Sequence, residues 1–316
     1  MAKKKETKTS AFGSPGRRSR DSSASYSSRV YQDQLSRSVQ PVEEAELPES
    51  ARDRIFLHAA ESMAELLDNC IHLMITSPPH NVLEEYDEGL SLTEYLAFLR
   101  TVFKETCRVL SAGGRACNNI ANLGRILYLP MHAFIIEEML NIGFLMRGEV
   151  LWDKGAGAAS STAWGTWLSA KNPVLRDVRE YILIFSKQAY GRQSQENHPT
   201  LEKAEFPAWT KSIWTFPTAS ARSIGHPAPF LKNSHAALIH LHAFSGDVIL
   251  DPFCGSGTTC AAAKRAGRRY GYEIEPILHQ IGKGSPGRSR TREFKIPVSR
   301  GGRVGSECLN DLSIPL

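Results

Sequence analysis

Residues 247–259 read Asp-Val-Ile-Leu-Asp-Pro-Phe-Cys-Gly-Ser-Gly-Thr-Thr, and this stretch decides the fold. The apolar residues 248–250 predict a short buried strand, and the pattern of Thr258–Ala266 predicts a helix directly after it. Glycines at 255 and 257 let the chain turn tightly and let its backbone approach a ligand closely. The N-terminus of the helix supplies unpaired N–H groups and the positive end of a dipole. The stretch therefore predicts a strand–loop–helix unit that suits a nucleoside cofactor.

Two other kinds of nucleotide-binding loop fit this stretch less well. No lysine follows Gly257, so the loop is not a P-loop, and its glycine spacing is not that of a dinucleotide site. Downstream, Tyr270-Gly271-Tyr272-Glu273 ends the next predicted strand in an acid, and a carboxylate there is well placed to accept both ribose hydroxyls of a nucleoside. The structural alternative is a glycine turn that only caps a helix, but Asp251 and Glu273 favour a binding site.

A second motif, Thr76-Ser77-Pro78-Pro79, closes the apolar run 71–75 and suits an exocyclic amine on a planar base. The lone pair of such an amine is conjugated into the ring, so the nitrogen is a poor nucleophile. Acceptors that take hydrogen bonds from both N–H groups favour a pyramidal nitrogen, whose lone pair can attack. The Ser77 hydroxyl and the Pro78 carbonyl are the predicted acceptors, because the prolines fix the loop and offer no competing N–H donor.

Three motifs in one order resemble the S-adenosylmethionine-dependent DNA amino-methyltransferases. Residues 251–259 look like motif I of that family, His226-Pro-Ala-Pro-Phe230 looks like motif X, and residues 76–79 look like motif IV. Motif IV first, followed by a recognition region and then motifs X and I, is the permuted order of the β class. The resemblance implies a Rossmann-like, doubly wound, mostly parallel α/β sheet. This is a circularly permuted class I methyltransferase fold with an inserted target-recognition region.

The resemblance also implies the cofactor, S-adenosyl-L-methionine, and the residues of the site. The expected catalytic residues are Ser77, Pro78, Pro79 and His80. The expected cofactor-binding residues are Asp251, Phe253, Gly255, Gly257, Thr258, Glu273, His226, Pro229 and Phe230. The family's position after Pro-Pro is normally Tyr or Phe, which stacks on the flipped base, whereas His80 stands there in this chain.

The target base is the N4 amine of cytosine on this interpretation, because Ser-Pro-Pro resembles the N4-cytosine subgroup. Asp-Pro-Pro-Tyr is the commoner N6-adenine form, so N6-adenine methylation on the same scaffold is the alternative. A further alternative is a catalytically impaired remnant that binds DNA or cofactor, because of His80 and a tail after Pro276 that departs from the family. A C5-cytosine enzyme is excluded, since none of the 17 prolines precedes a cysteine.

Strands alternating with helices along the chain predict the α/β sheet independently. Strands are expected at 52–57, 71–75, 115–120, 144–152, 180–185, 247–250 and 269–274, and helices at 60–67, 92–110, 129–140, 233–244 and 258–266, with a turn at 111–114. We expect a disordered tail at 1–50, a methyltransferase domain at 51–280 and an unpatterned basic tail at 281–316. Within the domain, the catalytic half spans 51–185, the recognition region 186–223 and the cofactor half 224–280.

The net charge of +5 lies in the tails, because residues 38–280 contain 22 basic and 27 acidic residues. Basic tails either hold phosphates or act as solvated segments. Within the domain, the expected DNA contacts are Lys154, Lys171, Arg176 and Arg222, although an exposed solubilising charge is an equal alternative for each. Core packing is the expected role of Trp164, Trp167, Trp209 and Trp214, and wedging or stacking is the alternative.

The six cysteines show no pairing pattern and no zinc spacing, so no metal site or disulfide framework is expected. No apolar run is long enough for a membrane span. We therefore expect a cytoplasmic protein, nucleoid-associated in a prokaryote, with double-stranded DNA as its partner and a cognate restriction endonuclease as a candidate second partner. These motifs specify neither a recognition sequence nor an oligomeric state.

Overall fold

The computed structural model describes residues 43–57, 59–79, 90–124, 127–155, 165–175, 177–192, 200–216, 234–254, 258–267 and 269–274. Several expected site residues lie outside these ranges: His80, Arg176, Arg222, His226, Pro229, Phe230, Gly255 and Gly257. Most of the expected N-terminal tail and all of the C-terminal tail also lie outside them.

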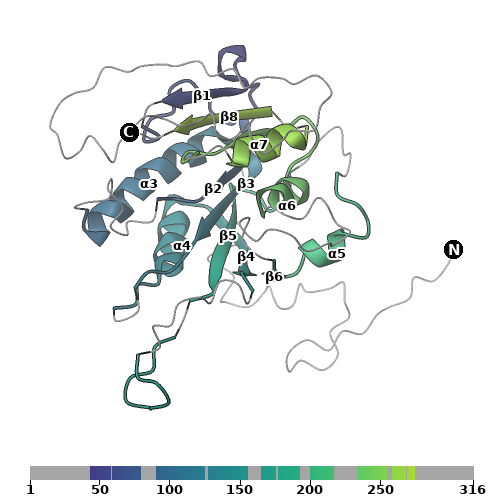
Figure 1. Ribbon diagram of the computed structural model, residues 1–316. Coiled ribbons are helices and arrows are strands. Elements are labelled where there is room, and N and C mark those ends of the chain that lie inside the picture. The colour runs from purple at the N-terminus through teal and green to yellow at the C-terminus, as the bar shows by residue number, and fades with distance from the viewer. Residues whose placement is uncertain are drawn as a thin grey trace, which may run out of the picture. The chain divides into compact units, whose positions relative to one another are not determined.

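The centre of the fold is one sheet of eight strands in the order β1-β8-β7-β2-β3-β5-β4-β6 (Figure 1). Their bounds are β1 (Arg54–Leu57), β2 (Ile71–Thr76), β3 (Leu110–Ile120), β4 (Leu145–Asp153), β5 (Arg179–Ser186), β6 (Ile213–Thr215), β7 (Val248–Leu250) and β8 (Arg269–Ile274). Neighbouring strands pair in parallel except at β5, which is antiparallel to both β3 and β4. The expected mostly parallel sheet is therefore confirmed.

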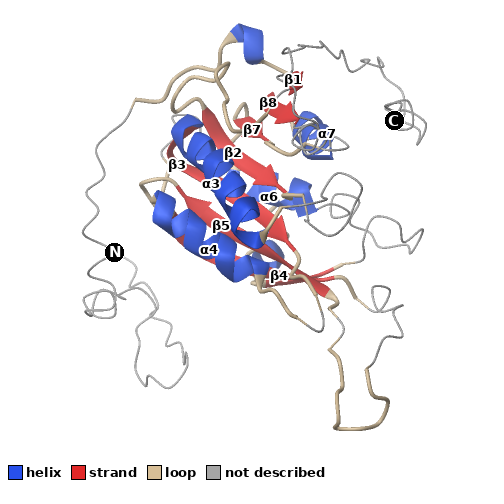
Figure 2. Cartoon of the chain, turned by 90° about the vertical axis from the view of Figure 1, so that its left-hand side faces the viewer, coloured by secondary structure: helices blue, strands red, loops and turns tan. Residues whose placement is uncertain are grey.

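Helices cover both faces of this sheet. The helices are α3 (Leu92–Val109), α4 (Met131–Ile142), α5 (Phe206–Trp209), α6 (Ser234–His242) and α7 (Thr258–Arg265), with a 3-10 turn at Glu49–Ala51. Figure 2 shows α3 and α4 together in front of the sheet and α6 behind it, and α7 packs beside α6. This is the doubly wound arrangement that the alternating pattern predicted.

The chain leaves the two central strands β2 and β7 in opposite directions. From β2 it passes through α3 to β3, and from β7 it passes through α7 to β8, on the other side of the sheet order. In open α/β sheets, ligands bind outside the carboxyl ends of the strands at such a switch point. The carboxyl ends of β2 and β7 carry the two motifs that the sequence singled out.

Local sequence explains the two elements that build this centre. All six residues of β2 are buried, as expected for a strand covered on both faces. The helix α3 begins at a capping box, in which the Ser91 hydroxyl accepts from the Glu94 N–H and the Glu94 carboxylate accepts from the Ser91 N–H. Its buried residues recur at helical spacing: Tyr95, Leu99, Val102, Phe103, Thr106 and Val109.

Two local predictions were wrong. Residues 60–67 form successive turns instead of a helix, because side chains of α3 bind their backbone. Arg108 donates to the Met63 and Leu66 carbonyls, and Glu105 accepts from the Met63 N–H. Residues 111–114 belong to β3 instead of forming a turn, and the register with β2 is irregular there.

Part of the expected recognition region belongs to the sheet. Within 186–223, α5 is followed by β6, which pairs with β4 and extends the sheet edge. Trp209 and Trp214 are buried there with their rings 5.0 Å apart, which confirms core packing for these two. Within the described part of the chain, no helix is both long and apolar enough to cross a membrane.

Candidate functional site

The two motifs meet at the centre of the sheet. Parallel pairing of Leu73 with Ile249 and of Met74 with Leu250 places the carboxyl ends of β2 and β7 side by side. At these ends the Thr76 hydroxyl donates a hydrogen bond of 2.7 Å to the Asp251 carboxylate. A single contact therefore joins the loop that suits an amine to the loop that suits a cofactor.

Asp251 is a buried carboxylate held by neutral donors. It accepts from the Thr76 hydroxyl, from the Thr259 hydroxyl at 2.5 Å and from the Phe253 N–H at 3.1 Å. Burial raises the pKa of Asp251 to about 6, and the three hydrogen bonds oppose that rise. Among the described residues, no cation forms an ion pair with this carboxylate. Its negative charge at neutral pH therefore suits a cationic ligand.

The helix α3 contacts both loops. The buried Tyr95 donates its hydroxyl to the Pro79 carbonyl at 2.8 Å, and the ring of Phe98 lies 5.9 Å from the ring of Phe253. Tyr95 and Phe98 stand three residues apart, so they lie on one face of the helix. The first two turns of α3 thus fix the Pro-Pro loop and the Asp251 loop relative to each other.

Two acceptors remain available in the Pro-Pro loop. Ser77 is half-buried and Pro78 is buried. Within the described residues, neither the Ser77 hydroxyl nor the Pro78 carbonyl makes a hydrogen bond, whereas Tyr95 occupies the Pro79 carbonyl. The two acceptors that the sequence predicts therefore have no hydrogen-bond partner among the described residues, next to the contact between Thr76 and Asp251.

The other expected cofactor residues lie at the same edge of the sheet. Thr258 begins α7, directly after the glycine loop, and is exposed. Glu273 lies near the carboxyl end of β8, which runs parallel to β7, so its backbone reaches the edge that carries Asp251. Thr259, which sequence reasoning did not assign, holds Asp251 through its hydroxyl.

A polar network at the ends of β3, β4 and β5 was missed by sequence reasoning. The Asn119 amide donates to Glu180 at 2.6 Å, and Lys154 forms an ion pair with the same carboxylate. The Lys154 ammonium also lies 5.7 Å from the centre of the Trp152 ring. Lys154, expected to contact a phosphate, is thus already engaged. The antiparallel register of β3 and β5 brings Asn119 and Glu180 together, and no local motif contains both.

Asn118 is a second residue that the sequence did not flag. It pairs in register with Thr76, and both polar atoms of its buried amide lack a hydrogen-bond partner among the described residues. Such groups are uncommon in native proteins, because a buried unpaired polar atom costs about 1–3 kcal/mol. The unpaired Asn118 amide lies one strand away from Ser77, and core packing does not explain a polar side chain there.

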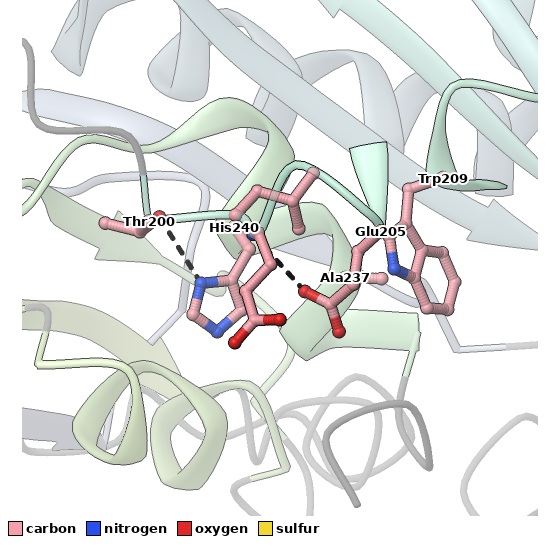
Figure 3. A pocket seen from close by; sticks show the side chains of 7 residues that line it. Thr200, Glu205, Trp209, Ala237 and His240 are labelled. Atoms are coloured by element: carbon pink, nitrogen blue, oxygen red, sulfur yellow. Dashed lines mark hydrogen bonds between the residues drawn. The ribbon is translucent and has the colours of Figure 1, made fainter. Parts of the chain in front are cut away.

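A small pocket lies away from this edge (Figure 3). Its volume is about 80 Å³, and its lining comes from Thr200, Leu201, Glu202, Glu205, Trp209, Ala237 and His240. His240 lies in the last turn of α6, which leads to the amino end of β7, whereas Asp251 follows the carboxyl end. In the part of the chain that the structure describes, no cluster of three or more acidic, histidine or cysteine side chains could hold a metal ion.

Comparison with known proteins decides which family carries this site. The family model of the N6/N4 DNA methylases matches residues 71–283, which is more than half of the chain. The chain belongs to this DNA methylase family. The matched range contains both motifs, the sheet strands from β2 to β8 and the switch point between β2 and β7.

Individual relatives agree with the family. The type II methyltransferase M.MjaI of Methanocaldococcus jannaschii is 30% identical over 275 residues, covering 72% of this chain and 89% of the relative. The structure of a DNA modification methylase from Thermus thermophilus in complex with S-adenosyl-L-methionine is 27% identical, with a TM-score of 0.54 over 73% of this chain and 91% of that chain. The PvuII DNA methyltransferase, which is cytosine-N4-specific, shares the fold at 18% identity and a TM-score of 0.53, covering 73% of this chain and 87% of that chain.

These comparisons confirm the resemblance and the fold class that the motifs implied. They also support S-adenosyl-L-methionine as the cofactor of this DNA methylase.

Proposed function

We propose that this DNA methylase transfers a methyl group from S-adenosyl-L-methionine to the N4 amine of cytosine at a specific site in duplex DNA. The observation that carries the proposal is the hydrogen bond from Thr76 to Asp251, which sets the amine-accepting loop beside the cofactor loop. The choice of cytosine rests on Ser77, since a serine before Pro-Pro resembles the N4-cytosine subgroup.

The residues of the switch point fit the proposed cofactor. Asp251 offers a buried carboxylate whose only described partners are neutral donors, which suits a cationic molecule. Phe253 offers an aromatic face beside it, and Glu273 belongs to the strand where a carboxylate can accept ribose hydroxyls. The remaining proposed contacts are Thr258, Gly255, Gly257, His226, Pro229 and Phe230. When bound, this cofactor supplies a methyl group already activated on a positively charged sulfur, so the protein needs no nucleophile of its own.

The Pro-Pro loop orients the attacking amine. In the proposed mechanism the Ser77 hydroxyl and the Pro78 carbonyl accept the two amine N–H groups, and the Tyr95 hydroxyl holds the loop through the Pro79 carbonyl. The acceptors become more effective as positive charge develops on the nitrogen, which stabilises the transition state. Proximity and orientation provide much of the remaining rate. His80 follows these residues and is proposed to stack on the extruded base.

The DNA is proposed to lie along the same edge. Lys171, Arg176 and Arg222 are the proposed phosphate contacts, and Lys154 acts from its position against Glu180. The proposed setting is the cytoplasm of a prokaryote, where a cognate restriction endonuclease would cut the unmethylated site.

Nucleoside analysis tests the proposal directly. The full chain is incubated with mixed-sequence duplex DNA and methyl-labelled S-adenosyl-L-methionine, and the digested nucleosides are identified by mass spectrometry. We expect labelled N4-methylcytosine. Labelled N6-methyladenine alone would overturn the choice of base, and calorimetric cofactor binding without transfer to DNA would support the impaired remnant. Sequencing the DNA of an expressing host for modified bases then gives the recognition site.

Substitution of Ser77 tests the amine acceptor. Ser77→Ala should lower kcat by about 10²–10³-fold, the usual loss when one group that stabilises the transition state is removed. Ser62→Ala is the matched control, because Ser62 is exposed and lies before β2. A Ser77→Ala protein with unchanged kcat would contradict the assigned role.

A further inference from the structure

The connection between β4 and β5 contains a hairpin tip that is braced by its own hydrogen bonds. Its described part, residues 165–175, is named the arm tip here. Gly165 and Pro173 form an antiparallel bridge, the Thr166 N–H donates to the Asn172 carbonyl at 2.9 Å, and the Asn172 N–H donates to the Thr166 hydroxyl at 2.8 Å. The Thr166 hydroxyl donates in turn to the Ser169 carbonyl at 3.1 Å. The tip therefore holds a defined shape with its own groups.

This defined shape presents large apolar side chains to solvent. Trp167 is 67% exposed and Leu168 is 89% exposed, at the point of the turn. Leu168 also has a φ of 51°, a left-handed conformation that is unfavourable for a residue with a branched side chain. Neither exposure nor this conformation serves core packing, and residues held in such conformations cluster at functional sites. The arm tip therefore keeps Leu168 in an unfavourable backbone conformation while Leu168 and Trp167 stay exposed to solvent.

The position of the arm tip links it to the reaction. The arm leaves the sheet where β4 ends at Asp153 and returns where β5 begins at Arg179, and the Lys154 N–H donates to the Val178 carbonyl at its base. Since β4 runs parallel to β3, which runs parallel to β2, this is the edge that carries Ser77. Figure 2 shows the arm tip, a tan loop, beyond the ends of these strands.

The charge of the arm tip selects DNA among the candidate occupants. Residues 165–175 contain no acidic side chain and one cation, the exposed Lys171. A surface of this kind can approach a polyanion, and its apolar point can leave water by entering the stack of flat base faces inside that polyanion. A duplex whose base has been extruded offers such a gap between the two bases that flank the extruded one.

We propose that Trp167 and Leu168 form a wedge that enters the DNA helix at the target base pair and occupies the space left by the extruded base. The proposal deepens the proposed function, on which it rests. Extrusion breaks stacking and pairing, and an apolar wedge offsets part of that cost by covering the exposed neighbouring bases. A preformed tip does so without ordering a loop at the moment of binding.

The variant Leu168→Gly tests the wedge side chain without changing the backbone conformation of the arm tip. Glycine adopts the left-handed conformation without strain, so the tip should keep its shape while it loses the side chain. Leu67→Ala is the control, because Leu67 is also exposed, at 52%, but precedes the amino end of β2. Two duplexes carry the sequence found methylated in the expressing host: in one the target base is paired, and in the other it lies opposite an abasic site.

We expect Leu168→Gly to lower kcat by roughly 10- to 100-fold on the paired duplex and to restore near wild-type kcat on the abasic duplex, where extrusion is already easy. Cofactor affinity should stay unchanged, and 2-aminopurine at the target position should show a smaller fluorescence increase than with the wild-type protein. Unchanged kcat on the paired duplex would overturn the wedge, as would an equal loss on both duplexes. A change of oligomeric state in light scattering would instead assign the arm tip to a second copy of the chain.

The wedge and the proposed function fail separately. If the methylated base of these duplexes is adenine, the choice of cytosine in the proposed function is wrong. The fluorescence measurement then still judges the wedge, because it reports extrusion without chemistry. Equal 2-aminopurine signals for wild type and Leu168→Gly would overturn it.

Discussion

At the scale of single residues, burial of the Asp251 carboxylate has a free-energy cost that a neutral side chain would not have. Its carboxylate is buried, and three neutral donors replace the water that would solvate it outside the fold. Burial has the largest effect on its pKa and raises it from the ordinary 3.8 to about 6. The folded state therefore binds the Asp251 proton more tightly than the unfolded state does.

This difference predicts how stability depends on pH. Because the folded-state pKa is the higher one, the contribution of Asp251 to the free energy of unfolding falls as pH rises from about 4 to about 6, by about 3 kcal/mol in total and by about 1 kcal/mol between pH 5 and 7.5. Asp251→Asn cannot ionise, so it should gain about that amount on the wild type between those two pH values. Urea unfolding of both proteins at pH 5 and 7.5 measures this gain. Parallel stability profiles would show that Asp251 titrates normally.

The placement of the candidate residues could be predicted from the sequence where each residue belongs to one short motif. Ser77, Pro78 and Asp251 follow buried strands, and the structure places the two loops in contact. Thr259 was missed although it stands in the same motif, because only the folded turn brings its hydroxyl to Asp251. The pair of Asn119 and Glu180 had no local signal, since an antiparallel register over 61 residues creates it.

At the scale of elements, α3 is the part that aligns the two loops. It reaches the Pro-Pro loop through the Tyr95 hydroxyl and the Asp251 loop through the Phe98 ring. Its capping box fixes where the helix begins, and that start decides which residues face the switch point. The helix therefore belongs to the site although none of its residues is a proposed substrate contact.

Removal of one hydroxyl tests this alignment. Tyr95→Phe should lower the free energy of unfolding by about 0.5–1.5 kcal/mol, the net value of one hydrogen bond. It should also lower kcat, because the Pro79 carbonyl loses its donor and the loop loses its fixed direction, while cofactor affinity stays unchanged. Thr106→Val is the matched control on the same helix, since the buried Thr106 hydroxyl donates only to the Val102 carbonyl. We expect the control to lose stability without losing kcat; equal kcat in both variants would contradict the role of Tyr95.

The elements themselves were largely predictable, and the exceptions have a common cause. Strong apolar periodicity located β2, α3, α4, β5 and α7 close to their observed bounds. Residues 60–67 have helical periodicity too, but Arg108 and Glu105 of α3 take up backbone groups that a helix would have paired internally. Tertiary hydrogen bonds of this kind override local preference, and they cannot be seen before the fold is known.

At the scale of the whole molecule, charge is divided between residues 38–280 and the two ends of the sequence. Residues 38–280 carry more acidic than basic side chains, whereas residues 1–37 carry nine lysines and arginines against three acids. Several cations of the domain are also engaged internally, such as Arg108 with Asp68 and Lys154 with Glu180. We expect a DNA methylase with this distribution of charge to draw much of its non-specific attraction for phosphates from residues 1–37 and 281–316.

The salt dependence of DNA binding measures that contribution. Each phosphate neutralised by a cation adds about 0.9 to the slope of log affinity against log salt concentration, so residues 1–37, with nine lysines and arginines, can add about 8 at most. A variant in which the nine lysines and arginines of residues 1–37 become glutamine should bind DNA with a slope that is shallower by up to that amount. Its kcat at saturating DNA should equal that of the wild type, because Ser77, Asp251 and the arm tip are untouched. Deletion of residues 1–37 is the companion variant, which removes the same charges and also shortens the chain. If both variants show the same slope, the loss of charge alone explains the effect. An unchanged slope in both would place the whole phosphate contact on the domain, with Lys171 as the first residue to substitute.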